Sequence, residues 1–294
     1  MNDAPQTPNA MVSALHQFIE GHPRLFVLTG AGCSTDSGIP DYRDRSGEWK
    51  RRQPIYFRDF TDNSAARQRY WARSMLGWPR IWQAEPNTSH YVLAHWQQSG
   101  HIGKLVTQNV DGLHQRAGSH DVIDLHGRLD AVQCMECNRR LDRHSYQREL
   151  EHTNNASQWV GTTAPDGDVD LDGVDLSTFE VPACRHCGGV VKPSVVFFGE
   201  AVPRKRVATA YRALRECDAV LVVGSSLMVF SGYRFCRAAA EHHKPIAVLN
   251  IGRTRADSIL ALKIDAACAG ILSAVASRLS GAEITPAQYA NSDA

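Results

Sequence analysis

Short apolar runs alternate along the chain with longer segments in which apolar residues recur at helical spacing. The apolar runs cover residues 24–29, 103–107, 219–223 and 245–250. The segments with helical spacing cover residues 11–19, 88–98, 204–217, 231–243 and 269–279. A short, uniformly apolar run is typical of a parallel strand that is buried on both faces. Strands and helices that alternate in this way predict an α/β fold with a doubly wound, Rossmann-like parallel sheet.

Two segments depart from this alternation and predict a second, smaller domain. Residues 43–82 hold four tryptophans and many arginines without a strand pattern, which favours a helical module. Another module contains two Cys-x-x-Cys pairs, and its middle, residues 161–175, contains five aspartates and is expected to be a solvated loop. The predicted boundaries place residues 1–42, 99–130 and 191–294 in the sheet domain, 43–98 in the helical module and 131–190 in the zinc-binding module.

The two cysteine pairs form a candidate metal site. Cys134 and Cys137 make the first pair, and Cys184 and Cys187 make the second. Each pair places two thiolates on one side of a tight turn, and four such sulfurs supply the tetrahedral corners that zinc prefers. Because four thiolates leave no coordination position open, we predict one structural Zn²⁺ rather than a catalytic one. Buried or disulfide-bonded cysteines are the alternative interpretation.

Charge and hydropathy narrow the class of protein. The chain has 32 Lys and Arg against 31 Asp and Glu, so its formal net charge is only +1. A near-neutral balance argues against a zinc-knuckle module that binds nucleic acid, although residues 204–206 make a local basic patch. The longest apolar stretch, residues 219–230, is too short to span a bilayer. We therefore expect a cytoplasmic protein that binds neither membranes nor, directly, nucleic acid.

Glycines and polar residues follow all four predicted strands. Gly30-Ala-Gly32 follows the first strand, Gln108-Asn-Val-Asp111 the second, Gly224-Ser-Ser226 the third and Asn250-Ile-Gly252 the fourth. In an open α/β sheet, ligands bind at the carboxyl ends of the strands, so these segments should face one crevice. Glycines would let the backbone approach a pyrophosphate, and amides of a following helix would hold its charge. By itself the glycine spacing is a weak signal, because it departs from G-x-G-x-x-G.

Taken together, these motifs resemble those of the sirtuins, which are NAD-dependent protein-lysine deacylases, over about residues 11–279. The motifs that carry the resemblance are Gly30–Arg43, Thr107–His114, Leu125–Gly127, the two cysteine pairs, Lys192–Glu200, Gly224–Leu227 and Asn250. Finer features resemble the class II branch, which includes the mitochondrial lipoamidase-type sirtuin. These features are Tyr42, the run 67–73 with Gly77 and Trp78, and an insertion that contains residues 164–168. Ser225 and Ser194 stand where Thr and Asp are commoner, and neither change removes a catalytic group.

The resemblance implies a reaction in two steps. The carbonyl oxygen of an acylated lysine displaces nicotinamide from C1′ of NAD, and a histidine then acts as general base on a ribose hydroxyl. The products are nicotinamide, free lysine and O-acyl-ADP-ribose. His126 matches this histidine, and imidazole suits the task because it titrates near working pH. Asn109 and Asp111 match the catalytic residues that hold ribose, an ordered water and the nicotinamide carboxamide.

The resemblance also assigns cofactor and substrate residues. Those expected to contact NAD are Gly30, Ala31, Gly32, Asp41, Tyr42, Arg43, Gln108, Asn109, Val110, Asp111, Gly224, Ser225, Ser226, Asn250, Ile251, Gly252 and Cys268. The segment formed by Val195, Val196, Phe197, Phe198 and Gly199 should pair with the backbone of an acylated-lysine protein as an added strand. Tyr70 and Arg73 have the Tyr-x-x-Arg spacing with which desuccinylase-type sirtuins hold an acidic acyl group. We therefore expect carboxylated or long acyl groups to be preferred to acetyl; packing of Tyr70 and a solvated Arg73 is the alternative.

Two other enzymatic activities remain open at the level of sequence. Mono-ADP-ribosyl transfer would use the same NAD site with a different acceptor. An NAD-dependent oxidoreductase with a structural zinc would also combine a cofactor fold with a metal. However, the sequence lacks a G-x-G-x-x-G turn followed about twenty residues later by an isolated ribose-binding acid.

Overall fold

The computed structural model describes residues 7–50, 54–154, 162–163, 169–171 and 173–280. Its helices are α1 (Pro8–Glu20), α2 (Phe57–Asp62), α3 (Ser64–Gln83), α4 (Thr88–Gln98), α5 (Leu113–Arg116), α6 (Arg143–Thr153), α7 (Arg204–Glu216), α8 (Phe230–Glu241) and α9 (Cys268–Ser280). Its strands are β1 (Leu25–Thr29), β2 (Ile102–Thr107), β3 (Ile123–Asp124), β4 (Gly127–Cys134), β5 (Arg140–Asp142), β6 (Thr162–Thr163), β7 (Val169–Asp170), β8 (Val191–Val195), β9 (Ala219–Val223), β10 (Ile246–Leu249) and β11 (Leu262–Ile264).

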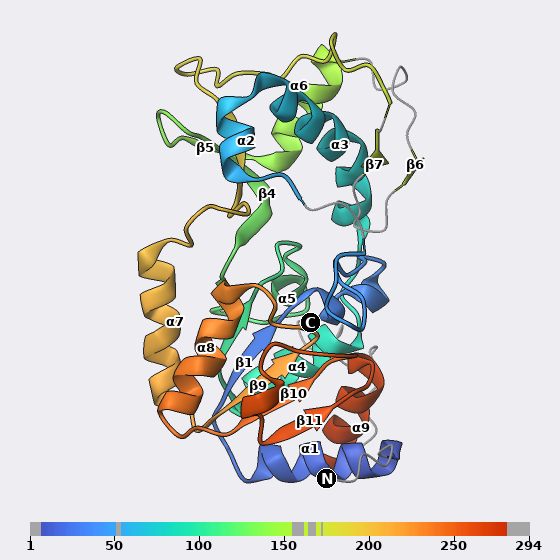
Figure 1. Ribbon diagram of the computed structural model, residues 1–294, viewed down its shortest axis with the longest axis vertical. Coiled ribbons are helices and arrows are strands. Elements are labelled where there is room, and N and C mark those ends of the chain that lie inside the picture. Colours follow the sequence, from blue (N-terminus) through green and yellow to red (C-terminus); the bar gives the residue numbers. More distant parts are fainter. Residues whose placement is uncertain (1–6, 51–53, 155–161, 164–168, 172, 281–294) are drawn as a thin grey trace, which may run out of the picture.

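A six-stranded parallel sheet forms the lower part of the molecule in Figure 1. Its strand order is β11-β10-β9-β1-β2-β3, and every neighbouring pair is parallel. The chain adds β2 and β3 on one side of β1 and later adds β9, β10 and β11 on the other side. Such a reversal of strand order opens a crevice at the carboxyl ends of the central strands. The predicted doubly wound α/β sheet is thus confirmed.

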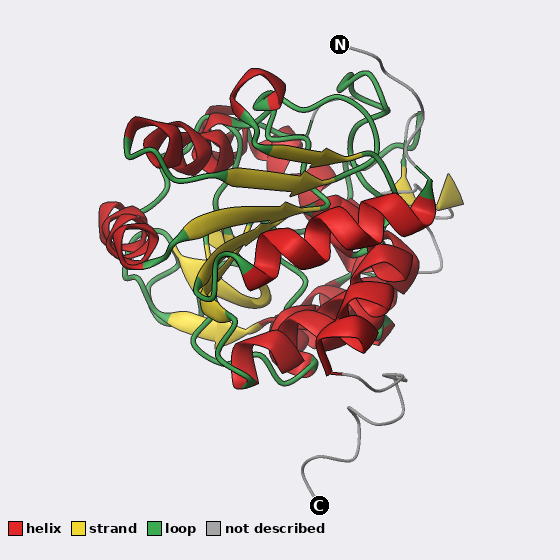
Figure 2. Ribbon diagram, turned by 90° about the horizontal axis from the view of Figure 1, so that it is seen from below, coloured by secondary structure: helices red, strands yellow, loops and turns green. Residues whose placement is uncertain are grey.

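Helices cover both faces of this sheet, as Figure 2 shows. On one face α1, α4 and α9 pack against apolar strand residues, and on the other α7 and α8 do so. Because both faces are covered, every residue of β1, β9 and β10 is buried, which explains why these strands are apolar in sequence apart from Thr29 at the end of β1. The predicted boundary assigns α4 to the helical module. In the structure its Val92, Leu93 and Trp96 lie in the core beside the sheet, so α4 packs with the larger body.

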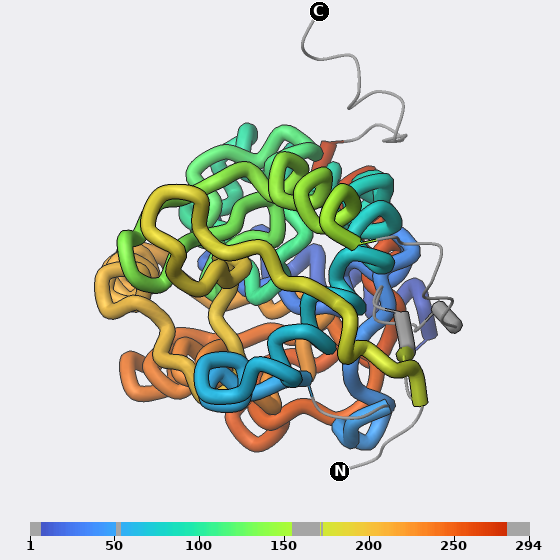
Figure 3. The backbone as a smooth tube through the Cα atoms, turned by 90° about the horizontal axis from the view of Figure 1, so that it is seen from above, coloured from blue at the N-terminus to red at the C-terminus, as the bar shows by residue number. Residues whose placement is uncertain are grey.

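The smaller module lies above the sheet in Figure 1 and contains α2, α3, α6 and a three-stranded antiparallel sheet, β5-β4-β8. Its core combines aromatic side chains of α2, α3 and α6, among them Phe60, Trp71 and Tyr146. Figure 3 views this module from above and shows α3 and α6 side by side, although they are distant in sequence. Seven of the fifteen residues of the acidic segment 161–175 lie outside the described residues, and its described part includes the short antiparallel strands β6 and β7, where only a loop was expected.

The sequence pattern did not predict α6 or β11. Helix α6 buries Arg143, whose guanidinium lies 4.9 Å from the ring centroid of Trp78 and donates to Gln147 Oε1 at 2.7 Å. A helix whose inner face includes a buried arginine has no ordinary apolar stripe. Strand β11 has only three residues, too few to show a pattern. Among the described helices, none combines the length and the apolar character of a membrane span.

Candidate active site

A cleft of about 1300 Å³ lies where the carboxyl ends of the sheet strands meet the small module. Residues that follow each of β1, β2, β9 and β10 line it, as their positions in the sequence predicted. From these segments come Gly30, Ala31, Gly32, Gln108, Asn109, Val110, Asp111, Gly224, Ser225, Ser226, Asn250 and Ile251. Asp41, Tyr42, Arg43 and His126 line the same cleft. The structure therefore brings most of the expected site residues together.

Two expected cofactor residues do not line the cleft. Cys268 is buried as the first residue of α9, and its thiol lies 3.8 Å from the carbonyl oxygen of Leu249. Gly252 has φ +80° and supports a neighbouring loop: a Cβ there would lie 2.3 Å from the backbone oxygen of Arg45. Both residues thus have structural surroundings that account for them without a ligand.

The glycine turn after β1 has a different local structure from the one expected. Instead of entering an α-helix, the chain forms two short 3-10 turns, Ala31–Cys33 and Thr35–Ser37. The turn packs closely against the end of β9, because a Cβ on Gly30 would lie 2.8 Å from the carbonyl oxygen of Gly224. Glycine at this position is therefore required by the approach of two backbones, whatever ligand the cleft binds.

The imidazole of His126 is held from both of its nitrogens. Nδ1 lies 2.9 Å from the carbonyl oxygen of Gln108, and Nε2 lies 2.7 Å from Oγ of Ser231. A carbonyl oxygen can only accept, so Nδ1 carries the proton and Nε2 of the neutral ring presents its lone pair. Burial, together with the charges of Arg206 and Arg234, lowers the pKa of His126 to about 4. The expectation of a pKa near neutrality is wrong for this structure: the ring is neutral and able to accept a proton.

Asn109 and Asp111 belong to one hydrogen-bonded group centred on Ser34. The Ser34 hydroxyl donates to Asp111 Oδ2 at 2.8 Å and accepts from Asn109 Nδ2 at 3.0 Å. Asp111 Oδ1 also accepts from the backbone N–H of Leu113 at 2.9 Å. Burial raises the pKa of Asp111, and these hydrogen bonds oppose the rise. Sequence reasoning did not single out Ser34, because a serine inside a glycine-rich turn has no signal of its own.

The loop that carries Asp41, Tyr42 and Arg43 is closed on itself around Trp49. The Arg43 guanidinium lies 4.0 Å from the ring centroid of Trp49 and donates to the carbonyl oxygen of Gly47 at 2.7 Å. Tyr42 meets the same indole edge to face, and Asp41 pairs with Lys50. Trp49 organises the loop, although its place in the sequence did not indicate this role.

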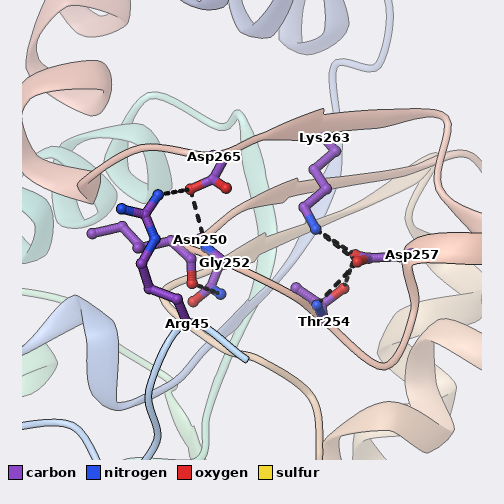
Figure 4. A network of polar contacts seen from close by, with 8 residues as sticks. Arg45, Asn250, Gly252, Thr254, Asp257, Lys263 and Asp265 are labelled. Carbon is purple, nitrogen blue, oxygen red and sulfur yellow. Dashed lines mark hydrogen bonds and ion pairs between the residues drawn. The ribbon is translucent and has the colours of Figure 1, made fainter. Parts of the chain in front are cut away.

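A second set of contacts joins this loop to the end of the sheet, as Figure 4 shows. Arg45 Nη2 pairs with Asp265 Oδ1 at 3.3 Å, and the same oxygen accepts from the backbone N–H of Gly252 at 3.0 Å. The carbonyl oxygen of Arg45 accepts from the N–H of Arg253 at 2.8 Å. The loop is thus fastened beside Asn250, whose amide Nδ2 donates to the carbonyl oxygen of Ile251 at 2.8 Å.

The side chains of Gln108 and Ser225 contact each other across the end of β1, from the carboxyl ends of the two strands, β2 and β9, that flank it. Gln108 Nε2 donates to Ser225 Oγ at 2.7 Å, and that oxygen also accepts from the N–H of Leu227 at 3.2 Å. Both residues line the cleft, and Ser225 is buried. This contact spans the strand ends at which the order of the sheet reverses.

The expected peptide-binding segment lies at the edge of the cleft, and all five of its residues line it. Strand β8 ends at Val195, and several backbone groups of the following residues already have partners within the chain. The N–H of Val196 donates to the carbonyl oxygen of His126 at 2.7 Å, and that of Phe197 donates to Glu200 Oε2 at 2.9 Å. The first of these bonds connects the segment directly to His126.

Helix α3 forms another wall of the cleft. Tyr70, Arg73, Trp78 and Ile81 line it from successive turns of this helix. The Tyr70 ring packs edge to face against Phe60 and Phe197. Tyr70 therefore does pack against neighbouring rings, as the alternative interpretation expected. The cleft therefore extends from the strand ends along α3, which gives it room for a side group beyond the reacting atoms.

The four cysteines of the two pairs meet in the small module. Their sulfurs all lie within 4.8 Å of one another. Cys134 Sγ lies 3.4 Å from Cys187 Sγ, and Cys137 Sγ lies 3.8 Å from Cys184 Sγ. A tetrahedral zinc with Zn–S bonds of about 2.3 Å separates its sulfurs by about 3.8 Å. The group is thus positioned to bind one structural zinc.

A second group with metal-ligand chemistry lies beneath the cleft, where Cys33, His90 and His114 bring one ligand atom each within 4.8 Å of the others. His90 Nδ1 accepts from the backbone N–H of Asn87 at 3.2 Å, so Nε2 of the neutral ring must carry the proton. Burial keeps this ring neutral by lowering its pKa well below the usual value. His90 thus has no lone pair to give, and two ligands are too few for a zinc site.

The comparisons with known proteins agree with this geometry. The Sir2 family model matches residues 30–231. Over 269 residues the chain is 58% identical to a protein of Bordetella bronchiseptica named NAD-dependent protein deacetylase, covering 90% of this chain and 97% of that protein. A protein of the same name from Xanthomonas campestris is 58% identical over 260 residues, covering 88% of this chain and 89% of that one.

Solved structures agree as well. A structure described as Sir2 with a p53 peptide and NAD+ has a TM-score of 0.74 and 27% identity, covering 92% of this chain and 98% of that one. Another, described as Sir2 bound to acetylated peptide, has the same TM-score, 27% identity and the same coverage.

Proposed function

The chain belongs to the Sir2 family of NAD-dependent protein deacylases, and from this premise we propose that His126 is the general base of its reaction. The observation that carries the proposal is the pair of contacts at the ring: Gln108 fixes the proton on Nδ1, and the Nε2 lone pair faces Ser231, which lines the cleft as His126 does. A neutral imidazole in this orientation would accept the proton of the attacking ribose hydroxyl.

We assign the remaining roles by position in the cleft. NAD supplies an electrophilic ribose carbon, and the residues at the ends of β1, β2, β9 and β10 would hold it across the strand ends. Asn109 and Asp111 would orient the nicotinamide side, since Ser34 fixes both side chains. Tyr42 and Arg43 would cover the site from the loop built on Trp49. Val195–Gly199 would hold the peptide that presents the acylated lysine.

Product analysis of His126→Ala tests the general-base proposal. Zinc-loaded protein is incubated with NAD and an acetyl-lysine peptide, and nicotinamide and O-acyl-ADP-ribose are quantified by mass spectrometry. Loss of a positioned base should lower the rate of O-acyl-ADP-ribose formation by about 10²–10⁴. A variant that forms this product at the wild-type rate would show that another group takes the proton. Protein-bound ADP-ribose without peptide deacylation would instead indicate the transferase activity.

We further propose that the protein resembles the class II branch in acyl preference and accepts carboxylated or long acyl groups better than acetyl. Tyr70 and Arg73, one helical turn apart on α3, line the part of the cleft that continues past Trp78 and Ile81. An arginine that faces this space would pair with an acyl carboxylate.

A panel of acetyl, succinyl, methylglutaryl and lipoyl peptides tests this preference. Turnover should be higher for at least one of the larger acyl groups than for acetyl. Arg73→Met should lower turnover of the carboxylated peptides selectively, whereas Arg80→Met, an exposed change on the same helix, should not. Equal or faster turnover of acetyl by the wild type would contradict the proposal.

The cytoplasmic location and the absence of direct nucleic-acid binding stay predictions, which cell fractionation and a salt-dependent DNA-binding assay would test.

A further inference from the structure

Ser231 makes a contact with the candidate base that neither its sequence position nor its own helix explains. Its Oγ lies 2.7 Å from His126 Nε2. Because Nδ1 of the ring carries the proton, the serine hydroxyl donates and Nε2 accepts. Ser231 lies in the first turn of α8, two positions after the N-cap residue Val229, and this helix has no side-chain cap. The hydroxyl is therefore directed at the imidazole rather than at its own backbone.

The two segments that contact the nitrogens of His126 also pack closely against each other. Gly232 follows Ser231, and a Cβ at that position would lie 2.5 Å from Oε1 of Gln108. Gln108 is the residue whose carbonyl oxygen fixes the opposite nitrogen of His126. The start of α8 and the end of β2 thus form a clamp with the imidazole between them. A clamp that touches both nitrogens sets the ring orientation and the tautomer together.

We propose that Ser231 is a positioning residue for the deacylation step. It holds the Nε2 lone pair of His126 toward the cleft until the ribose hydroxyl replaces it as the donor. The inference rests on the proposed role of His126 as general base. One lone pair accepts one strong hydrogen bond, so the serine hydroxyl and the ribose hydroxyl occupy it in turn. The proton of the ribose hydroxyl then passes to Nε2 as its oxygen attacks the acyl carbon, and Ser231 itself gains and loses no proton.

This role predicts an effect on only one of the two chemical steps. The first step breaks the bond between C1′ and nicotinamide and forms a bond from C1′ to the acyl oxygen, without proton transfer to His126. Its reversal in the presence of labelled nicotinamide places label in NAD. The second step requires the oriented lone pair. A change at Ser231 should therefore slow formation of O-acyl-ADP-ribose and leave nicotinamide exchange at the wild-type rate.

The experiment measures both rates for four variants of the full, zinc-loaded chain with NAD and an acetyl-lysine peptide. We expect Ser231→Ala to lower O-acyl-ADP-ribose formation about tenfold, the effect of losing one hydrogen bond, with exchange unchanged. Ser231→Thr keeps the hydroxyl and should restore most of the rate. Ser145→Ala is the matched control, because Ser145 also lies in a first helical turn and its hydroxyl makes one hydrogen bond, to Arg148, outside the cleft.

Several outcomes would overturn the inference. If Ser231→Ala leaves both rates unchanged, the contact has no role in positioning. If it lowers both rates equally, the residue supports the fold or NAD binding instead. His126→Ala separates this inference from its premise: a loss of product in His126→Ala without a loss in Ser231→Ala overturns the serine role alone. An undiminished His126→Ala overturns the general-base proposal, and the serine role with it.

Discussion

The small module and the floor of the cleft each gather cysteine or histidine side chains at metal-ligand distances, yet the two clusters differ in which lone pairs remain. In the small module four sulfurs converge, and Cys187 is exposed. Beneath the cleft, both nitrogens of His90 already have partners in Asn87 and Ser34, which leaves only Cys33 and His114 as ligands. The comparison teaches that residue type and proximity are insufficient: a metal site also requires lone pairs that the fold has not already used.

The two clusters should differ most in their response to the loss of zinc: stability and activity should depend on the ion held by the four cysteines. Structural zinc contributes roughly 10–16 kcal/mol to the folding of small modules, and β4 reaches one cysteine pair directly. Cys184→Ser should lose the bound zinc, unfold the small module and abolish deacylation. Metal content by mass spectrometry and the fluorescence of Trp71 and Trp78 would report this. Cys217→Ala, which alters a buried cysteine of the sheet domain, should keep one zinc per chain; a metal-free variant that stays active would contradict the structural role.

A fall in pH should lower the free energy of unfolding through protonation of the buried His114 rather than through loss of a metal ion. Burial lowers the pKa of His114 to about 4, against about 6.5 when the chain is unfolded. The unfolded state therefore binds the proton first as pH falls. Stability from this group is complete above pH 6.5 and decreases as the pH approaches 4, by about 3 kcal/mol in all.

Denaturant unfolding between pH 7 and pH 4.5 would measure this decrease. His114→Leu removes this titrating group and should make the profile less steep, while His90 and His126, whose pKa values burial also lowers, keep part of the slope. The lost partner of Thr29 should cost about 2 kcal/mol at neutral pH. A profile as steep as that of the wild type would show that other groups cause the acid sensitivity.

Replacement of the cluster's thiol should have the smallest effect. Cys33 is buried, and removal of its one sulfur atom leaves a small cavity, so Cys33→Ala should lower the free energy of unfolding by about 1 kcal/mol. The zinc content should stay at one per chain. Two zinc ions in the wild type and one in this variant would show that the buried cluster does bind metal and that His90 does have a lone pair to give.

Much of the fold could be predicted because its elements repeat simple patterns. The apolar runs at β1, β2, β9 and β10 were recognisable since strands buried on both faces tolerate few polar residues. Helix α6 was not, because Arg143 on its buried face breaks the apolar stripe. The packing of α4 depends on which surface its apolar face meets, and periodicity contains no such information.

The candidate site divides in the same way. The sequence by itself determined the four thiolates and the glycine and polar residues at the strand ends, because these chemistries are local and their spacing is fixed by turns and strands. Only the tertiary structure decided the pKa of His126 and the partners of its two nitrogens, since burial and the Ser231 contact join segments 105 positions apart. It also decided that His90 cannot serve a metal. Protonation state and free lone pairs depend on neighbours brought together by folding, which is why no local motif contains them.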